Sequence, residues 1–372
     1  MISRALRGLL VLAVLAAAQD ADWLSARPDY HWSFPRDHWA HPAYKTEWWY
    51  FTGQLTDTQD SSRHFGYQFT FFRVGVLPVA PDLNSDWAAT MMIMGHAAIT
   101  DVAGNSHVFS EVLYRAAPLL GGFGAEGDTM VAWSRGPAGT EDRWTLRWRD
   151  GAFAFTMADR RRSIALDLST GAGKPLVFQG PNGYSLKSAA GSASQYYSLT
   201  RVSTAGTVQI AGRSYTVTGT SWMDKEFSSS PLGRDQVGWD WFGLQFDDGR
   251  ELMLYLMRDS TGATNFANGT VVGRDGATRY LGANDFTVQS SAQWTSDSTR
   301  ATYPARWTLS VPSERLELTV TPLVADQENR SEILRRLYYW EGAVAIRDTS
   351  GRPFGRGYVE LVGYGRGLRP AL

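Results

Sequence analysis

The residues of this chain best suited to chemistry are carboxylic acids set among aromatic residues. The clearest case is the segment Trp222-Met223-Asp224-Lys225-Glu226-Phe227, in which Trp222, Asp224 and Glu226 stand two residues apart. Side chains two residues apart on a strand share one face, so these three should point the same way. A carboxyl that faces an apolar cavity has its pKa raised by desolvation and can act as a general acid near neutral pH. We therefore predict that Asp224 is a proton donor and that Glu226 can share a proton with it.

Three further acids have a similar aromatic setting. Glu47 precedes Trp48-Trp49-Tyr50, Asp240 lies between Trp239 and Trp241, and Glu341 follows Trp340. The alternation of a strand places Trp239 and Trp241 on one face and turns Asp240 away from them. Aromatic faces around an acid can stabilise a developing carbocation by cation–π attraction. This combination is suited to general-acid chemistry that passes through a developing carbocation.

These patterns define a predicted site. The predicted catalytic residues are Asp224, Glu226, Asp240 and Glu47. The predicted ligand-binding residues are Trp48, Tyr50, Trp222, Trp239, Trp241 and His41. The alternative is that the acids have structural roles and pair with the cations Lys45, Lys225, Arg234 and Arg258.

Other kinds of site have little support in the sequence. There is no HExxH, G-x-S-x-G or dinucleotide-binding glycine motif, and we expect no cofactor. The absence of cysteine excludes thiol nucleophiles and cysteine-ligated metals. A zinc site from His38, His41 and His96 is conceivable, but unspaced histidines on strands more often have packing roles, and we predict no metal.

Composition narrows the range of partners. The 372 residues carry a formal net charge of -1, and the longest basic run is Arg160-Arg161-Arg162. This charge offers no footprint for a polyanion, so we do not expect nucleic acid as a partner. We expect a monomer that binds a hydrophobic small molecule.

The elements that must position these residues are strands. Phe65, Tyr67, Phe69 and Phe71 alternate with smaller or polar residues, and Asp247-Asp248-Gly249 is a turn signal between two such runs. The 37 glycines and the scarcity of helical periodicity predict an antiparallel all-β architecture. One helix is expected over residues 326–337.

Matching segments recur in the same order in both halves of the chain. EWWYFTGQLTD from Glu47 aligns with GWDWFGLQFDD from Gly238, so that Gln54 meets Gln245. RWTLRWRDGAFAFTM from Arg143 aligns with RWTLSVPSERLELTV from Arg306. A weaker pair, SQYYSLTRV and LYYWEGAV, would place Asp224 over Glu360. The chain is therefore predicted to contain two related units, each a barrel or a sandwich.

The N-terminus reads as a signal peptide over residues 1–18, with Arg4 and Arg7 before an apolar stretch that ends in Ala16-Ala17-Ala18. The predicted units are then residues 19–235 and 236–372, with the boundary in the Ser/Pro/Gly-rich stretch 228–238. We expect an exported protein, periplasmic or secreted.

The Trp-rich motifs resemble one known family. HPAYKTEWWYFTG, SWMDKEF, GWDWFGLQFDDGRELMLY, YWEGAV and GYVELVGY are similar to motifs of the carotenoid 1,2-hydratase (hydroxyneurosporene synthase) family, which includes AttH-like secreted hydrolases. The resemblance spans residues 38–366 and implies two lipocalin-like barrels with a ligand cavity.

The resemblance also implies an activity. A hydratase of this kind protonates a terminal isoprenoid double bond, and water captures the tertiary cation, which requires a carboxylic acid in an aromatic pocket and no cofactor. On this analogy Asp224 is the proton donor, and Glu47, Glu226 and Asp240 orient groups or relay protons.

Two other functions stay open. The chain could be a non-enzymatic periplasmic carrier of a lipid or terpenoid, with an ABC-type membrane transporter as a partner. It could also be a secreted hydrolase, although Ser221, the serine beside Trp222, has no histidine near it in sequence.

Overall fold

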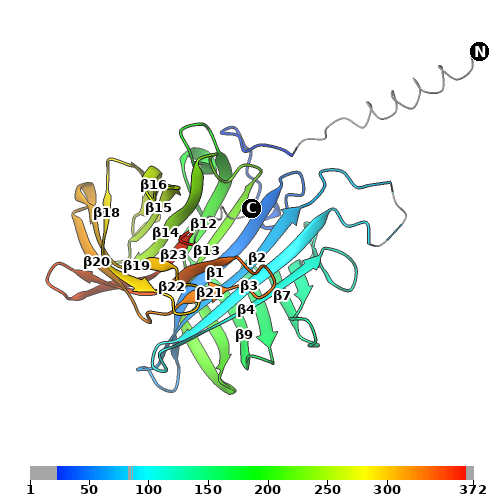
Figure 1. Cartoon of the computed structure of the whole chain (residues 1–372), viewed down its shortest axis with the longest axis horizontal. Helices are drawn as coiled ribbons and strands as arrows, with labels where there is room; N and C mark the ends of the chain where they lie inside the picture. Colours follow the sequence, from blue (N-terminus) through cyan, green and yellow to red (C-terminus); the bar gives the residue numbers. More distant parts are fainter. Residues whose placement is uncertain (1–22, 83–84, 86, 366–372) are drawn as a thin grey trace, which may run out of the picture.

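The computed structural model describes residues 23–82, 85 and 87–365, and within them nearly all regular structure is antiparallel strand. The only helical elements among these residues are three short 3-10 turns, η1 (Arg36–His38), η2 (Pro181–Gly183) and η3 (Pro312–Glu314). Figure 1 shows two strongly curved sheets side by side. The predicted all-β fold of tandem lipocalin-like barrels is confirmed. The predicted signal peptide lies outside the described residues.

The first barrel is the sheet with the strand order β4-β3-β2-β1-β13-β12-β9-β8-β7-β6-β5, and β10 and β11 also pair with β12. Its strands are β1 (Thr46–Asp57), β2 (His64–Gly75), β3 (Met91–Asp101), β4 (Ser106–Arg115), β5 (Gly121–Phe123), β6 (Met130–Arg135), β7 (Arg143–Arg149), β8 (Ala152–Asp159), β9 (Ile164–Gly173), β10 (Val177–Phe178), β11 (Tyr184–Leu186), β12 (Ala193–Ile210) and β13 (Arg213–Ser228).

The second barrel has the order β17-β16-β15-β14-β23-β22-β20-β19-β18, and β21 pairs with β22. Its strands are β14 (Gln236–Phe246), β15 (Glu251–Asp259), β16 (Thr264–Val272), β17 (Thr278–Gly282), β18 (Thr287–Thr295), β19 (Thr302–Val311), β20 (Leu316–Pro322), β21 (Glu328–Arg330), β22 (Tyr338–Asp348) and β23 (Pro353–Val362).

Each barrel encloses a core of its own side chains. In the first, Trp49, Phe51 and Phe69 belong to one buried cluster, and in the second Phe242 and Trp307 belong to another. A strand directs alternate side chains to opposite faces, so the residues next to these point out of the barrels. Those outward side chains form a third buried cluster, between the barrels, that includes Tyr50, Trp222, Trp241, Tyr255 and Tyr358.

The register of the ladders supports the internal duplication. β1 and β14 hold equivalent places in the two sheets, each paired on one side with β13 or β23. Tyr50 lies opposite Asp224, and Trp241 lies opposite Glu360. The same correspondence was predicted by the alignment of the segments that start at Glu47 and Gly238, and by the weaker pair that set Asp224 over Glu360.

The segments that start at Arg143 and Arg306, which the sequence also aligned, lie one strand out of step with the other matching pairs. Counting outward from β12 and β22, β9 corresponds to β20 and β8 corresponds to β19. The alignment of Arg143 with Arg306 instead set β7 over β19. Neighbouring strands of an antiparallel sheet run in opposite directions, so this pair cannot superpose with the others. Repeated aromatic alternation within one sheet accounts for the false match.

The helix expected over residues 326–337 is not formed. The segment contains β21 and irregular turns. The buried Glu328 carboxylate accepts hydrogen bonds from Ser296 and Tyr303, and Glu328 pairs with Trp340 in the ladder. These long-range contacts hold the chain extended and override its local helical preference.

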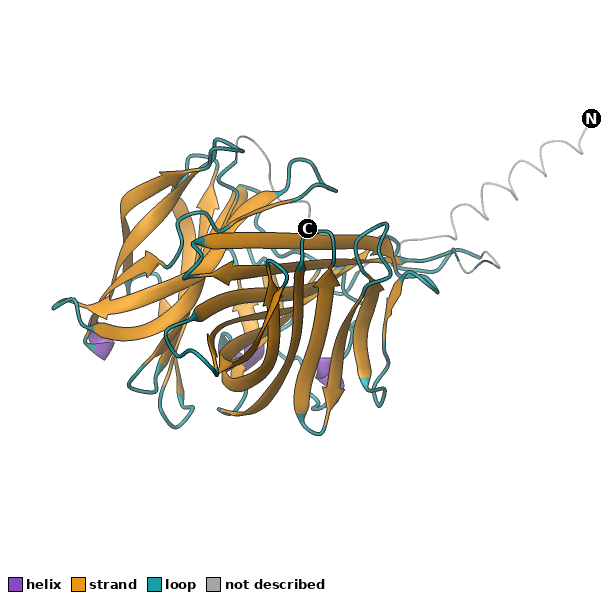
Figure 2. Ribbon diagram, turned by 90° about the horizontal axis from the view of Figure 1, so that it is seen from below, coloured by secondary structure: helices purple, strands orange, loops and turns teal. Residues whose placement is uncertain are grey.

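Two related glutamines join the barrels. The side-chain amide of Gln54 on β1 donates to the carbonyl oxygens of Val344 and Gly357, both at 2.9 Å. Gln245 on β14 donates in the same way to carbonyls of β12 and β13, at 2.8 and 3.2 Å. The sequence aligned these two residues with each other, so the duplication includes the reciprocal contact. Figure 2 shows how strands make up nearly all of both sheets, with loops at their ends.

No helix among the described residues has the length and apolar character that a membrane crossing requires.

Candidate functional site

A cavity of about 120 Å³ lies between the two barrels. The outward faces of β1, β2, β3, β12 and β13 form one wall, β14, β15, β22 and β23 form the other, and Pro231 and Leu232 of the connecting segment also line it. The family resemblance implied lipocalin-like barrels with a ligand cavity. The barrel interiors hold the buried clusters described above, and this cavity lies between the barrels.

Aromatic side chains make up much of the cavity wall. Trp48 and Tyr50 come from β1, Trp239 and Trp241 from β14, and Tyr255 from β15. Trp48 and Trp239 are half-buried, whereas Tyr50 and Trp241 are buried and pack edge to face with ring centroids 5.4 Å apart. Four of the predicted ligand-binding residues are thus brought together in the cavity.

Asp224 projects from β13 into this space with only 3% of its surface exposed. Its Oδ1 accepts hydrogen bonds from the Ser198 hydroxyl and from the Trp222 indole at 2.7 Å, and its Oδ2 accepts one from the Tyr196 hydroxyl at 2.8 Å. Burial raises the pKa of Asp224 to about 7, because desolvation outweighs these hydrogen bonds to the charged form. The carboxyl is therefore partly protonated near neutral pH.

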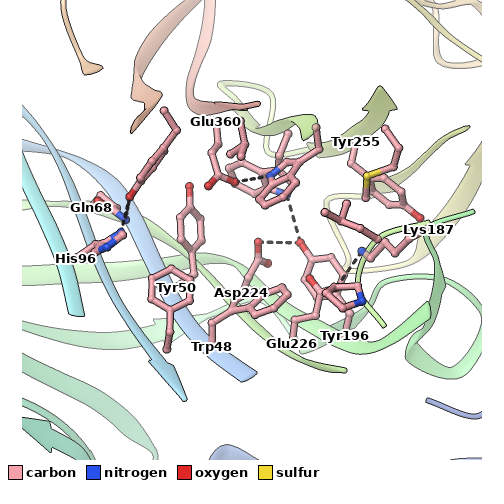
Figure 3. A pocket seen from close by; sticks show the side chains of 18 of the residues that line it. Trp48, Tyr50, Gln68, His96, Lys187, Tyr196, Asp224, Glu226, Tyr255 and Glu360 are labelled. Atoms are coloured by element: carbon pink, nitrogen blue, oxygen red, sulfur yellow. Dashed lines mark hydrogen bonds and ion pairs between the residues drawn. The ribbon is translucent and has the colours of Figure 1, made fainter. Parts of the chain in front are cut away.

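Glu360 projects from β23 on the opposite wall. Figure 3 shows Asp224 and Glu360 facing the same space from opposite sides. The Trp239 indole donates to Glu360 Oε2 at 2.8 Å. Burial, together with the negative charges of Asp224 and Glu226, raises the pKa of Glu360 to about 7. Two acids from duplicated positions thus titrate in the same range. Sequence reasoning missed Glu360 as a site residue, although the duplication pointed to its position.

A third acid lies beside Glu360 on the neighbouring strand. Glu341 on β22 pairs directly with Glu360 in the ladder and is 1% exposed. Burial and the charge of Glu360 raise the pKa of Glu341 well above its usual range, which favours the neutral carboxyl.

Glu226 has a partner of opposite charge. Lys187 Nζ lies 3.0 Å from Glu226 Oε1, and both side chains line the cavity and are buried. The ammonium also lies over the rings of Tyr196 and Tyr255, at 4.8 and 4.4 Å from the centroids. This ion pair lies at one end of the cavity, and the ammonium beside it makes Glu226 a less suitable acid than Asp224.

Three of the predicted site residues lie elsewhere. Glu47 is on the same face of β1 as Trp49, inside the first barrel, and its carboxylate contacts His41 Nδ1 at 2.6 Å, Arg73 Nε at 2.7 Å and the ammonium of Lys225. Burial opposes ionisation of Glu47, but these partners, Lys225 foremost, hold its pKa well below the usual range. Glu47 and His41 thus belong to a buried ion network and do not line the cavity.

Asp240 faces the interior of the second barrel. Its carboxylate is 2.8 Å from Arg258 Nε and accepts hydrogen bonds from the Tyr364 hydroxyl at 2.9 and 3.0 Å. The structural alternative, in which acids pair with nearby cations, therefore describes Asp240 and Glu47. Trp222 is in an intermediate position, since it packs behind the cavity and reaches the site through its hydrogen bond to Asp224.

Other candidates from the sequence are separated in space. Ser221 faces the interior of the first barrel, where its hydroxyl bonds to Tyr67 and Thr204. His38 bonds to Tyr197, while His96 bonds to Tyr339 on the other side of the sheet. No group of three metal-ligating side chains converges within the described residues.

Comparisons with known proteins agree with this architecture. The family model for AttH-like proteins matches residues 25–364. A solved structure from Nitrosomonas europaea that carries the AttH designation has 31% sequence identity and a TM-score of 0.79, over 92% of this chain and 100% of that chain. A comparison with curated proteins found no match.

A second solved structure is that of kievitone hydratase from Nectria haematococca. It superposes with a TM-score of 0.66 over 93% of this chain and 97% of that chain, at 14% sequence identity. At this level of identity the match shows a shared fold.

Proposed function

Because this chain belongs to the AttH-like family, we propose that its inter-barrel cavity is the active site of a cofactor-independent hydratase. The reaction is the addition of water to an isoprenoid carbon–carbon double bond. The observation that carries the proposal is the pair Asp224 and Glu360, two carboxyls with raised pKa on opposite walls of an aromatic cavity. The shared fold with a hydratase supports the same reaction class.

Asp224 is the general acid in this proposal. Its Oδ1 already accepts two hydrogen bonds, whereas Oδ2 accepts one, so Oδ2 is the oxygen that can carry the transferable proton. The π electrons of the substrate take that proton and form a carbon–hydrogen bond, which leaves a tertiary cation. The three donors then stabilise the carboxylate that remains.

Trp239, Trp241 and Tyr50 surround the space in which the cation forms. Their faces attract positive charge, and the apolar wall limits the water that reaches it. A water molecule donates an oxygen lone pair to the cation and forms the new carbon–oxygen bond. The carboxylate of Glu360 accepts the proton that this water loses, and proton exchange returns both acids to their starting state.

The two acids must hold different protonation states. Both have a pKa of about 7, and the charge of Asp224 contributes to the raised value of Glu360. A coupled pair of this kind loses its protons in two steps, with one proton shared between the two acids at intermediate pH. Near neutrality the pair therefore supplies one acid and one base.

The size of the cavity limits how much of a substrate can enter it. Its volume of about 120 Å³ is below the roughly 300–1,000 Å³ of typical small-molecule sites. The cavity therefore suits a short terpenoid or the end of a longer chain.

A carrier is the second candidate function. The observation that favours it is the apolar, aromatic wall of the cavity, which would hold a lipid or terpenoid end without chemistry. We also propose export to the periplasm or the exterior, on the basis of the signal-like residues 1–18, and a membrane transporter as a candidate partner. A hydrolase that uses Ser221 has less support, because this hydroxyl faces away from the cavity.

The direct test of the proposal is product analysis. Purified protein is incubated with acyclic carotenoids and with shorter terpenes that end in a trisubstituted double bond. A hydratase yields products heavier by the mass of one water. A carrier co-purifies with or retains the terpene unchanged, which would refute the catalytic proposal.

A further inference from the structure

His96 carries a polar atom that the proposed chemistry does not use. The side chain projects from β3 and lines the cavity, with 2% of its surface exposed. Figure 3 shows His96 beside Gln68, at the end of the cavity opposite Lys187 and Tyr255. Its Nδ1 is hydrogen-bonded to the Tyr339 hydroxyl at 2.8 Å, but its Nε2 is buried with no partner among the described residues.

The neighbours of His96 determine which ring nitrogen holds the proton. Burial lowers the pKa of His96 to about 3, so the ring is neutral and has one N–H. The Gln68 amide approaches the Tyr339 oxygen as a donor, at 3.5 Å. The Tyr339 hydroxyl can then direct its own proton to Nδ1, which leaves the ring proton on Nε2. In this tautomer the unpaired atom is a hydrogen-bond donor.

The surroundings of this donor are apolar. The His96 ring contacts Phe72 and Phe109 edge to face, with centroids 5.2 Å apart in each case, and Met94 lines the cavity from the same strand. A donor in such surroundings is costly to leave unpaired. An uncharged acceptor on a ligand would satisfy it, whereas a carboxylate would add a further negative charge to a cavity that already holds several acids.

We propose that His96 Nε2 is a binding site for a carbonyl oxygen on the ligand. The ligand class is then an unsaturated ketone or a similar neutral carbonyl compound, with its branched hydrocarbon end between Asp224 and Glu360. This inference rests on the proposed function for the reacting end of the ligand. The oxygen site itself rests on His96 alone. In this scheme His96 is a specificity-determining residue.

The test measures binding without turnover. The probes are methyl isohexyl ketone, which has no double bond to hydrate, and the saturated hydrocarbon of the same carbon skeleton. Both are volatile, so headspace gas chromatography over protein solutions gives both dissociation constants. We expect His96→Phe to lower the preference for the ketone over the hydrocarbon about five- to tenfold, as the loss of one buried neutral hydrogen bond requires. His96→Gln, which keeps an amide donor near Nε2, should recover most of the preference.

A second measurement uses the wild-type protein only. In histidine-labelled protein, the ketone should shift the Nε2 resonance of His96 and the hydrocarbon should leave it unchanged. An equal preference in wild type and His96→Phe, an unshifted Nε2 resonance, or failure of the ketone to bind would overturn the inference. If the ketone preference holds but its unsaturated analogue is not hydrated, the proposed function fails and the oxygen site stands.

Discussion

At the scale of single residues, the face of the strand decides what each acid can do. Asp224 lies two residues after Trp222, and Glu47 directly precedes Trp48. Asp224 points out of the first barrel into the cavity, whereas Glu47 points inward to Arg73 and Lys225. For Asp224, burial outweighs the hydrogen bonds and raises the pKa. For Glu47, the cationic partners together outweigh burial and lower the pKa. Only the first is a usable proton donor near neutral pH.

The Glu360→Gln substitution tests the proposed base. Glutamine keeps the shape and can accept the hydrogen bond from the Trp239 indole, but it cannot take a proton from water. We expect the hydration rate to fall by about 10²-fold or more, in the range typical of general acid–base groups. Steady-state turnover measures the change. Glu317→Gln, at an exposed position on β20, is the matched control, and equal rates in the two variants would argue against a role for Glu360.

The hydration rate should depend on pH in a bell-shaped manner centred near pH 7. Below the pKa of Glu360, about 7, the base becomes protonated. Above the pKa of Asp224, also about 7, the acid loses its proton. Both limbs fall within a range accessible to assay, and a rate that stays flat from about pH 5 to pH 9 would be incompatible with an acid–base pair.

Part of the site could be predicted from the sequence by strand alternation alone. The structure has the predicted arrangement on β14, with Trp239 and Trp241 on one face and Asp240 on the other. Strand alternation also places Glu47 on the face opposite Trp48 and Tyr50. Glu47 was nevertheless predicted as a site residue, because it directly precedes a tryptophan. His96 and Lys187 could not have been predicted, because they reach the cavity from β3 and from the loop after β11 through contacts that only the folded barrels create.

At the scale of elements, the glutamines on β1 and β14 link the two sheets that form the cavity walls. Gln54→Leu should destabilise the protein by roughly 1–3 kcal/mol, since it removes the two hydrogen bonds that this buried amide donates to carbonyls of the second barrel. Urea unfolding measures the loss. The control is Gln289→Leu on the exposed face of β18, and an equal effect of both substitutions would show that the inter-barrel contact contributes nothing.

The duplication was the most informative sequence signal for the elements. It paired Gln54 with Gln245 and Asp224 with Glu360, and both pairs occupy equivalent places in the structure. It failed for Arg143 and Arg306, because strands of one sheet share the same alternation and a shift by one strand still aligns aromatic residues. The expected helix over residues 326–337 failed because contacts of Glu328 with distant residues decide its conformation.

At the scale of the whole molecule, the buried acids link stability to pH. The pKa of Asp224 is raised in the folded state, so its contribution to stability is complete below about pH 4 and is lost as the pH rises through about 7. The buried His38 and His96 act in the opposite direction, because burial lowers their pKa to about 3 and their contribution is lost as the pH falls. The total pH dependence is therefore a balance of opposing groups.

A comparison with Asp224→Asn isolates one of these groups. Relative to this variant, the wild type should lose stability on the order of 3 kcal/mol between about pH 4 and pH 8, from the linkage between its raised pKa and folding. Urea unfolding of both proteins at several pH values gives the difference. Parallel stability curves would mean that Asp224 keeps an ordinary pKa in the folded protein.

The proposed function depends most on one step, the protonation of a double bond by Asp224 in the cavity between the barrels. The most direct measurement is hydration of a short acyclic terpene in water enriched in the heavy oxygen isotope, with wild type and Asp224→Asn compared by mass spectrometry. We expect a labelled tertiary alcohol from the wild type and a rate at least about 10²-fold lower from the variant. Labelled product formed at the wild-type rate by Asp224→Asn would contradict it.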